Sequence, residues 1–434
     1  MSPDIPLTDW LTHLEALHPR GQAGIELGLE RIRAVKAELG QRQDGVVITV
    51  GGTNGKGSTC AYLENILDRA GYRVGCYTSP HVLAYNERVR LNGRPVDDAA
   101  LCAAFAKVAA ACRASGVTLT YFEFGTLAAW EVFAAAGVAV AILEVGLGGR
   151  LDAVNVYAPD VAIVTTVALD HTDWLGADRD SIGFEKAGIF RAGVPALCGD
   201  PEPPPRLLEY ARDIGADLRL LGRDFGFTRT AEDRLQWQWW CRSGGRIVRR
   251  TLAYPGLRGP AQLINATLAL AALDAIADRL PVTMQAIRPG LIETELVGRF
   301  QVIPGQPTMV LDVGHNPQAL RVLADNLGSM GFFARTLAVV GMLADKDIAG
   351  ALAALKGRVD VWHVATLDGP RGAPAAKLAA IIAASDLGGE IISHQSPAAA
   401  IAAAQGQARE SDRILVFGSF YTVAGALTVL RRKT

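Results

Sequence analysis

Short apolar runs alternate with longer helical patterns along the first half of the chain. The apolar runs predict buried strands at residues 46–50, 73–78, 138–145, 160–167 and 194–198. Between these runs apolar residues recur at helical spacing, as in the stretch STCAYLENILDRAGY that follows Lys56. Strands that are apolar on both faces and alternate with helices are typical of a parallel sheet covered by helices. We therefore predict an α/β fold built on a mostly parallel sheet.

The alternation of strands and helices lapses around PEPPP, residues 201–205. From there to about residue 258 we expect irregular structure or short antiparallel strands. The aromatic run WQWW at 237–240 lies in this segment and could stack on a ligand. Its alternation within a hairpin closed at 243–245 favours packing instead. A helical pattern at 261–278 closes this first region.

A second series of strand patterns begins after GRFQVI, residues 298–303. Further runs at 308–313, 336–341, 359–364 and 413–418 are separated by alanine-rich helical patterns. This predicts a smaller Rossmann-like α/β domain, although the segment has no G-x-G-x-x-G fingerprint and so does not indicate a dinucleotide. We place the boundary near Leu296, with domains at 1–296 and 297–434.

Length, composition and charge narrow the class of protein. A chain of 434 residues is too long for a single hydrophobic core, so we expect two domains. A chain that is 50% hydrophobic and 20% charged is expected to be soluble and globular. Its net charge of -1 gives no general attraction to nucleic acid or to an anionic membrane. The six cysteines form no C-x-x-C pair, the amino terminus lacks a signal-peptide pattern, and the longest apolar stretch, 132–143, is too short to span a bilayer. We expect a cytoplasmic protein whose partners are small molecules.

The stretch TVGGTNGKGSTC, residues 49–60, joins the first predicted strand to a helix. Its four glycines allow positive φ angles and turn backbone N–H groups toward an anion at the helix amino terminus. The spacing differs from the usual P-loop by one residue on each side, because Gly51 and Gly55 enclose three residues and Gly57 separates Lys56 from Ser58. A tight turn with no ligand is the alternative. Four glycines and a lysine favour a phosphate site, hence a P-loop-type first domain.

Polar side chains follow several predicted strands. Glu144 ends one strand, Asp170 and His171 follow the next, and Ser79 and His81 follow the strand after the glycine-rich loop. Ligands bind at the carboxyl ends of strands in open α/β sheets, and a magnesium ion near a nucleotide takes one or two protein carboxylates. Each residue also has a simpler explanation, as a cap, a satisfied histidine or a Ser-Pro turn.

Two further groups are candidates for chemistry. Lys186 lies in FEKAGIF beside Glu185, where a solvated surface charge is the usual interpretation. Asp312 and His315 lie where a strand of the second domain runs into a helix, and we expect them to face a cleft between domains. Strand-end clusters in both domains suggest a reaction that requires domain closure.

Nine motifs in order along the chain closely resemble the folylpolyglutamate synthase and dihydrofolate synthase family, a branch of the Mur ligase superfamily. They cover nearly the whole chain. The motifs are GTNGKGS at 52–58, TSPHV at 78–82, YFEFGTLAA at 121–129, EVGLGGRLDAVN at 144–155, DHTDWLG at 170–176, EKAGI at 185–189, GRFQ at 298–301, LDVGHNP at 311–317 and GSFYTV at 418–423.

The resemblance implies an ATP-dependent carboxylate-amine ligase. In this family the γ-phosphate of ATP passes to a carboxylate of dihydropteroate or a reduced folate, and the amine of L-glutamate attacks the acyl phosphate. It also implies Mg²⁺, with a monovalent cation as a further candidate, and we expect a monomer without nucleic-acid or membrane partners. The first domain would bind ATP and the pterin, and the second would be the glutamate ligase domain.

The family pattern also implies roles for individual residues. Lys56, Lys186 and His315 would act in catalysis, and Lys186 would be carbamylated. The implied ATP-binding residues are Asn54, Gly55, Lys56, Gly57, Ser58, Asn265, Arg299 and Asp312. The implied metal ligands are Ser79, Glu144, His171 and Lys186. The implied folate-binding residues are Leu27, Gly28, Leu29, Phe122, Glu123, Phe124, Gly125, Leu151, Asp152 and Ala153. The second domain would serve phosphate or glutamate through His315, Lys346 and Ser419.

The chain departs from the family pattern at several positions. Phe184 occupies a position where the family often has arginine. Ala261 and Gln262 occupy positions where the family often has His-Gln, and Gly314 occupies one where it often has alanine. A peptidoglycan-precursor Mur ligase is one alternative, but only 50 residues precede Gly51, too few for its additional domain. A nucleotide-dependent switch is another, and the N-K-x-D element typical of that class does not occur. The ligase remains the favoured interpretation.

Overall fold

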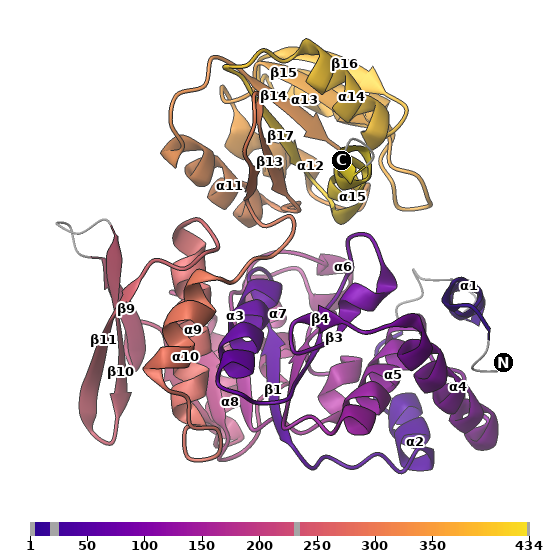
Figure 1. The fold of residues 1–434 in the computed structure, drawn as a ribbon, viewed down its shortest axis with the longest axis vertical. Coiled ribbons are helices and arrows are strands. Elements are labelled where there is room, and N and C mark those ends of the chain that lie inside the picture. Colours follow the sequence, from indigo (N-terminus) through magenta and orange to yellow (C-terminus); the bar gives the residue numbers. More distant parts are fainter. Residues whose placement is uncertain (1–4, 18–25, 230–234, 432–434) are drawn as a thin grey trace. The chain divides into compact units, whose positions relative to one another are not determined.

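The computed structural model describes residues 5–17, 26–229 and 235–431 (Figure 1). The chain divides into two compact units. The first comprises Met1–Gly256 and Leu263–Thr294, and the second comprises Leu257–Gln262 and Glu295–Thr434. Among the described residues no helix is long and apolar enough to cross a membrane. All six cysteines are free thiols.

An eight-stranded sheet forms the centre of the first unit, in the order β4-β3-β2-β5-β1-β6-β7-β8. Along the part of this order that runs β2-β5-β1-β6-β7-β8, neighbouring strands are parallel. At the other end of the sheet, β3 is antiparallel to both β2 and β4. The predicted α/β class and the five predicted strands are therefore confirmed. The strands are β1 (Val46–Gly51), β2 (Val74–Tyr77), β3 (Val89–Leu91), β4 (Arg94–Pro95), β5 (Val140–Glu144), β6 (Val161–Val164), β7 (Pro195–Cys198) and β8 (Asp217–Leu220).

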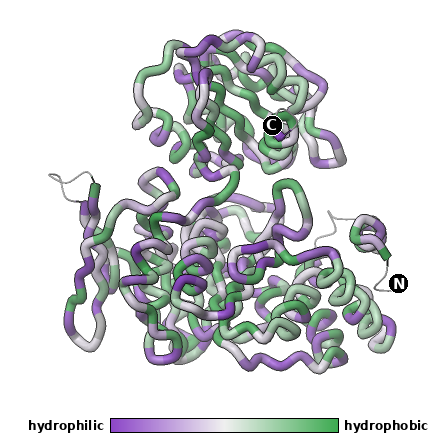
Figure 2. The backbone as a smooth tube through the Cα atoms, viewed as in Figure 1, coloured by the Kyte–Doolittle hydropathy of each residue, from purple (hydrophilic) through white to green (hydrophobic). Residues whose placement is uncertain are grey.

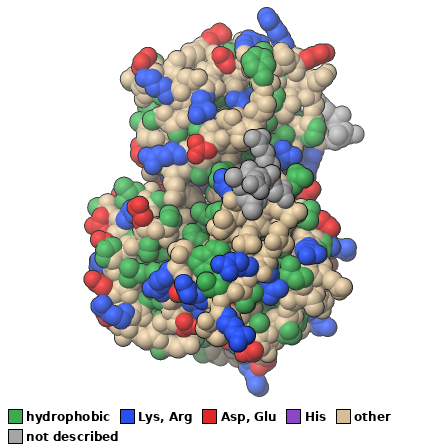
Figure 3. Space-filling model, turned by 90° about the vertical axis from the view of Figure 1, so that its left-hand side faces the viewer, with side chains coloured by type: hydrophobic (Ala, Val, Ile, Leu, Met, Phe, Trp, Pro, Cys, Tyr) green, Lys and Arg blue, Asp and Glu red, His purple; other side chains and the backbone are tan. Residues whose placement is uncertain are grey.

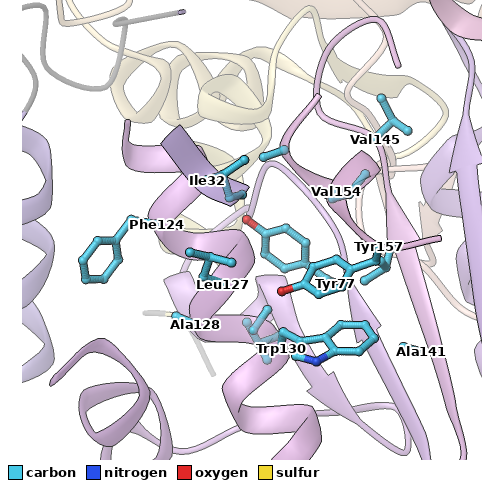
Figure 4. Packing of buried hydrophobic residues seen from close by; sticks show 14 of the residues in the cluster. Ile32, Tyr77, Phe124, Leu127, Ala128, Trp130, Ala141, Val145, Val154 and Tyr157 are labelled. Atoms are coloured by element: carbon cyan, nitrogen blue, oxygen red, sulfur yellow. The ribbon is translucent and has the colours of Figure 1, made fainter. Parts of the chain in front are cut away.

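Helices cover this sheet in two groups. Helix α3 packs across β1, β2 and β5 with α10 against it, whereas α4 and α5 pack on each other and contribute to a separate core together with α1, α2, α7 and α8. Figure 4 shows part of that core, where the rings of Trp130 and Tyr157 stack at 3.8 Å. The helices are α1 (Leu7–Leu17), α2 (Glu30–Glu38), α3 (Lys56–Arg69), α4 (Asp98–Ser115), α5 (Tyr121–Ala136), α6 (Thr172–Leu175), α7 (Arg179–Ala187), α8 (Pro205–Asp213), α9 (Pro260–Ala275) and α10 (Met284–Ile292), with 3-10 turns at Tyr85–Arg88 and Ala153–Val156.

The expectation of irregular or antiparallel structure directly after residue 201 is wrong. Helix α8 and strand β8 continue the alternation, and β8 pairs in parallel with β7. Pro205 occupies the first turn of α8, where its fixed φ suits a helix start and its missing N–H costs no hydrogen bond. The proline run therefore begins a helix. β8 lies at the sheet edge and is only partly buried, so its sequence shows no apolar run.

The antiparallel hairpin around the tryptophan cluster is confirmed. Strands β9 (Phe225–Arg229), β10 (Gln236–Ser243) and β11 (Arg246–Ala253) form a separate sheet. Trp237 and Trp239 are buried on one face of β10, and the indole N–H of Trp237 donates to the carbonyl of Ala253 at 2.9 Å. Packing, and not ligand stacking, accounts for these tryptophans. Figure 3 shows the side of the first unit that carries this sheet, with basic side chains among hydrophobic ones; charged side chains on an edge strand disfavour pairing with another strand.

The second unit is a six-stranded sheet in the order β12-β13-β17-β14-β15-β16, in which only β12 is antiparallel to its neighbour. Its central strands run through the hydrophobic interior (Figure 2). β16 was not predicted because it consists of half-buried and exposed residues and so has no continuous apolar run. The strands are β12 (Gln301–Ile303), β13 (Thr308–Asp312), β14 (Thr336–Val340), β15 (Val361–Ala365), β16 (Glu390–His394) and β17 (Arg413–Phe417). The helices are α11 (Pro317–Ser329), α12 (Ile348–Leu352), α13 (Ala375–Ala384), α14 (Pro397–Gln407) and α15 (Phe420–Arg431), with a 3-10 turn at Ala353–Leu355.

Candidate functional site

The glycine-rich loop lies between β1 and α3, and two of its glycines are required by their surroundings. Gly52 and Gly55 have φ angles of 134° and 90°, and Gly55 is the N-cap of α3. A Cβ atom on Gly52 would lie 1.9 Å from Oγ1 of Thr165, and one on Gly55 would lie 2.4 Å from Oδ1 of Asn265. The loop is therefore packed tightly between the end of β6 and helix α9. This close approach brings Asn265 to the loop.

The loop is fixed by hydrogen bonds to residues directly after β6. The N–H groups of Thr53 and Asn54 donate to the carbonyl and the hydroxyl of Thr166, at 2.7 and 3.1 Å. Lys56 begins α3, and its ammonium donates to the carbonyls of Gly52 and Thr53 at 2.9 and 3.3 Å. A cation is thus held over the turn at the positive end of α3, where a phosphate would bind.

Ser79 and Glu144 come together at the carboxyl edge of the sheet. β2 and β5 are neighbours, so the loop after β2 meets the last residue of β5. The N–H of Ser79 donates to Oε2 of Glu144 at 3.1 Å, and the Glu144 side chain is buried. These are two of the predicted metal ligands.

His171 follows β6 and has a left-handed backbone, with φ of 53°, where it precedes α6. Its side chain is 31% exposed, and its Nε2 lies 4.0 Å from Oδ1 of Asp170. Among the described residues no three His, Cys, Asp or Glu side chains form a group that could hold a metal ion. The donors fit a magnesium ion that takes a single carboxylate, a serine hydroxyl, phosphate oxygens and water.

Lys186 lies in the last turn of α7 and is buried, so the interpretation as a solvated surface charge is wrong. Burial, and after it the nearby charge of Lys56, lowers the pKa of its amine to about 7. The carboxylates of Asp170 and Asp152 act in the opposite direction. The structure thus brings Lys186 to the same electrostatic environment as Lys56. A large share of the amine is neutral near physiological pH.

Asp152 holds the loop that follows β5. Its carboxylate accepts hydrogen bonds from the N–H groups of Leu147 and Val154, at 2.8 and 3.0 Å. Burial raises its pKa to about 6, against the lowering effect of these bonds and of Lys56. These hydrogen bonds show that Asp152 shapes the glycine-containing turn. Of the three predicted folate-binding residues at 151–153, Asp152 and Ala153 are buried and Leu151 is half-buried.

Phe184 lies among cations although it stands where arginine is common in the family. The guanidinium carbons of Arg206 and Arg150 lie 4.7 and 5.6 Å from its ring centroid, and Arg150 pairs with Glu185 at 2.8 Å. Tyr210 contacts the same ring edge-on. Two guanidinium groups therefore flank the Phe184 ring, and one of them is paired with Glu185.

The stretch YFEF opens helix α5, so Phe122 and Phe124 point in different directions. Phe122 is half-buried, and a Cβ on Gly146 would lie 2.6 Å from its ring. Phe124 is buried against Phe105 at 5.7 Å, and Figure 4 shows it pointing away from Tyr77. Of the two rings, Phe122 is the one that borders the loop after β5.

Glu123 is buried although it is charged. Its carboxylate accepts the N–H of Thr120 at 2.8 Å in a capping box and pairs with Arg31 at 3.1 Å. Gly125 is required because a Cβ there would lie 2.6 Å from the hydroxyl of Tyr85.

The segment at residues 27–29 precedes α2. Gly28 has a φ of 150°, and Glu30 accepts the N–H of Leu29 at 3.1 Å. Leu29 packs into the core, whereas Leu27 is half-buried.

In the second unit, polar residues gather at the carboxyl edge of the sheet. Asp312 accepts the N–H groups of Phe300 and Gly314 at 2.9 and 2.7 Å, and burial raises its pKa against the opposing charge of Arg299. The Arg299 guanidinium lies 5.6 Å from the ring of Phe420. This links the GRFQ and LDVGHNP motifs around one carboxylate.

His315, Ser419 and Lys346 follow three adjacent strands, β13, β17 and β14. Nδ1 of His315 lies 3.0 Å from the carbonyl of Val313, so this nitrogen carries the proton. Ser419 is buried, and its hydroxyl bonds the N–H and the hydroxyl of Thr422 at 3.0 and 2.7 Å at the start of α15. Lys346 is half-exposed in the loop after β14.

Sequence reasoning missed residues that support the site. Thr165 and Thr166 hold the glycine loop, and Arg31 joins the segment at 27–29 to α5. Two hydroxyls directly after a buried strand were a usable signal for the threonines. Nothing in the sequence marks Arg31 among the exposed charges of its helix.

Known proteins share this architecture. Residues 50–196 match the Mur ligase middle domain, and residues 298–420 match the Mur ligase glutamate ligase domain. The dihydrofolate synthase/folylpolyglutamate synthase of Escherichia coli K12 is 46% identical over 426 residues, which cover 98% of this chain and 96% of that protein. The solved structure of Escherichia coli FolC in complex with DHPP and ADP has a TM-score of 0.92 and 44% identity, covering 100% of this chain and 99% of that one. A bifunctional folylpolyglutamate synthase/dihydrofolate synthase from Yersinia pestis c092, complexed with AMPPNP and Mn ion, has a TM-score of 0.88 and 44% identity over 99% of both chains.

Proposed function

The chain belongs to the dihydrofolate synthase/folylpolyglutamate synthase family of Mur-type ligases, and we propose that it uses ATP to join L-glutamate to dihydropteroate or a reduced folate. Two observations support the site assignment: the charge of Lys56 acts on the buried amine of Lys186, and Glu144 ends β5 beside the end of β1, which leads into the glycine loop. We assign ATP phosphates, metal and folate to the first unit, and glutamate to the second.

The proposed reaction has two steps. A carboxylate oxygen of the folate substrate attacks the γ-phosphorus of ATP, and the bond to the bridging oxygen of ADP breaks. The amine of glutamate then attacks the acyl phosphate, inorganic phosphate leaves, and the amine loses a proton. Lys56 and the N–H groups at the start of α3 stabilise the negative charge on the transferring phosphoryl group.

We propose that a divalent ion, Mg²⁺ in the cell, is held by Ser79, Glu144 and His171. When bound, this ion neutralises charge on the phosphate oxygens. Glu144 supplies the hard anionic oxygen that such an ion prefers, and its hydrogen bond from Ser79 fixes the carboxylate. The solved relative with AMPPNP contains Mn.

Lys186 is proposed to be carbamylated. Its nitrogen attacks the carbon of carbon dioxide, a C–N bond forms, and the amine proton is lost, which leaves an anion. Only the neutral amine can react, and burial lowers its pKa to about 7, so the reactive form is abundant. The anion would offset the charge of Lys56 and would offer a hard oxygen to the metal or its waters.

The folate is proposed to lie against Phe122, Leu27 and Leu151, which are half-buried. An aromatic ring offers stacking area to the flat pterin. Glu123, Phe124, Leu29, Asp152 and Ala153 would act from the core, by shaping the segments that carry those residues.

Arg299 and Asp312 of the second unit are each proposed to bind ATP, and the same role is proposed for Asn265 of the first unit. His315 and Lys346 would serve glutamate or the phosphate, and Ser419 would position the start of α15. We further propose a cytoplasmic monomer that has neither nucleic acid nor a membrane as a partner.

Isotope transfer tests the first step directly. Dihydropteroate labelled with ¹⁸O in its carboxylate is incubated with the protein, ATP, Mg²⁺ and L-glutamate. We expect ¹⁸O to appear in the released phosphate, because the carboxylate oxygen remains on phosphorus when the acyl phosphate breaks down. Product without label in phosphate would refute the acyl phosphate.

A further inference from the structure

Arg31 connects two segments that are distant in sequence and that both contribute to the proposed folate site. It lies on α2, directly after the segment at 27–29. Its Nη1 donates to Oε1 of Glu26 at 2.6 Å, and its Nη2 donates to the backbone carbonyl of Glu26 at 2.8 Å. The same guanidinium contacts the carboxylate of Glu123 at 3.1 Å through Nη2 and at 3.5 Å through Nε. One side chain thus joins the backbone before Leu27 to the first turn of α5.

The two partners of Arg31 differ in what holds them in place. Glu123 is 4% exposed and is also fixed by Thr120, whose N–H donates to it at 2.8 Å. Glu26 is 54% exposed and lies outside any helix or strand. Because a guanidinium donates in a rigid planar fork, binding Glu123 fixes the direction in which the remaining N–H groups point. We therefore infer that Glu123 on α5 fixes the Arg31 side chain, and that Arg31 in turn positions the segment that begins at Glu26.

This segment adjoins the residues to which we assign the folate. Leu27 follows Glu26 directly, and Phe122 precedes Glu123 in α5. Gly28 has a φ of 150°, and Glu30 fixes only the far end of the segment, by accepting the N–H of Leu29. The near end is fixed by Arg31.

We propose that Arg31 is a positioning residue for the folate substrate: it holds Leu27 in register with Phe122 so that the two form one wall of the pterin pocket. The inference rests on the proposed function, since it assumes that folate binds at these two segments. Arg31 itself acts through Glu26 and needs no contact with the substrate. Its loss should weaken folate binding without affecting the phosphate loop.

A purely structural role is the competing explanation, in which Arg31 only neutralises the buried carboxylate of Glu123. Two features separate the roles. Arg33 lies on the same helix and is exposed, so Arg33→Ala is a matched control. Glu123→Gln keeps an oxygen acceptor for Thr120 and removes the charge. If neutralisation is the whole role, Glu123→Gln should rescue Arg31→Ala; if Arg31 positions Glu26, it should not.

The test compares Arg31→Ala, Arg31→Lys, Arg33→Ala and the double variant Arg31→Ala/Glu123→Gln in the full chain. Steady-state kinetics give kcat and KM for dihydropteroate, ATP and glutamate, and calorimetry gives the Kd for dihydropteroate. We expect Arg31→Ala to raise the KM and Kd for dihydropteroate about ten-fold, as for loss of a charged hydrogen bond, with the KM for ATP within about two-fold of wild type. Arg31→Lys should recover part of the affinity, Arg33→Ala should match wild type, and the double variant should stay weak.

Several outcomes would overturn the inference. Unchanged dihydropteroate affinity in Arg31→Ala, an equal loss for ATP, or full rescue by Glu123→Gln each contradicts positioning. If Arg31→Ala does not fold, Arg31→Lys with wild-type KM and Kd would do the same. Failure of the proposed function is a distinct result: the wild type would form no glutamylated product, and Arg31 would still be judged by the calorimetric Kd.

Discussion

Replacing Lys186 by methionine should make the protein more stable and inactive. Lys186 is buried near Lys56, and burial, followed by the charge of Lys56, lowers the pKa of its amine from 10.5 to about 7. Methionine has a similar length and no charge, so it fills the same space without the cost of burying an ammonium group. It cannot take up carbon dioxide, so the proposed carbamate is lost.

The magnitude follows from the pKa of the amine in the folded and unfolded states. Between pH 10.5 and about 7 the unfolded chain binds a proton that the folded chain does not, so the free energy of unfolding falls as pH falls through this window. At about 1.4 kcal/mol per pH unit, the full cost is about 5 kcal/mol near pH 6.5 and about 1.4 kcal/mol at pH 9.5. The stability gained by Lys186→Met should therefore shrink by about 3 kcal/mol between these two pH values.

Urea unfolding of wild type and Lys186→Met at pH 6.5 and 9.5, in buffer free of carbon dioxide, measures this difference. Excluding carbon dioxide keeps Lys186 as the free amine. Lys107→Met is a control, because Lys107 is an exposed lysine that pairs with Glu131 at 3.1 Å, so its replacement removes a lysine without removing a buried amine. A gain in stability from Lys186→Met that is the same at both pH values would refute a buried amine with a lowered pKa.

Three further predictions concern the first unit. Lys56→Ala should fold normally and lose about 100- to 1,000-fold in kcat, the usual cost of one charge-stabilising contact; near-normal turnover would contradict its role. Phe122→Ala should raise the KM for dihydropteroate more than that for ATP, whereas Phe124→Ala should lower the free energy of unfolding by about 3–5 kcal/mol, measured by urea titration; the reverse pattern would exchange their roles. Chelation by EDTA should abolish activity, Mg²⁺ or Mn²⁺ should restore it, and Glu144→Ala should raise the half-saturating metal concentration by at least about ten-fold in a metal titration; an unchanged metal requirement would remove Glu144 from the site.

The core of the fold was predictable because buried parallel strands need continuous apolar runs. β1, β5 and β6 are buried along their whole length, and each appears in the sequence as such a run. β8 and β16 lie at sheet edges and carry mixed residues, so periodicity could not separate them from loops. The proline run at 201–205 suggested the end of regular structure, but Pro205 begins helix α8. A proline can precede or follow regular structure, and the sequence does not show on which side of Pro205 the helix lies.

For the site, residues at strand ends could be selected, but not their contacts. The pairing of Ser79 with Glu144, which are 65 positions apart in sequence, follows from the adjacency of β2 and β5 in the sheet order. The lowered pKa of Lys186 is caused mainly by burial. The sequence does not show that this lysine of an amphipathic helix is buried. The helical conformation of YFEF decides which phenylalanine borders the loop after β5, and a short aromatic run in the sequence does not show whether the segment is helical.

The central claim is that this chain joins glutamate to a folate by using ATP. The most direct measurement is ADP release by the purified protein with dihydropteroate or tetrahydrofolate, each with and without L-glutamate, together with the mass of the folate product. We predict ADP in equal amount to a product that is larger by one glutamyl residue, formed only when ATP, folate and glutamate are all present. ADP release that is independent of both co-substrates, or a folate of unchanged mass, would contradict the account.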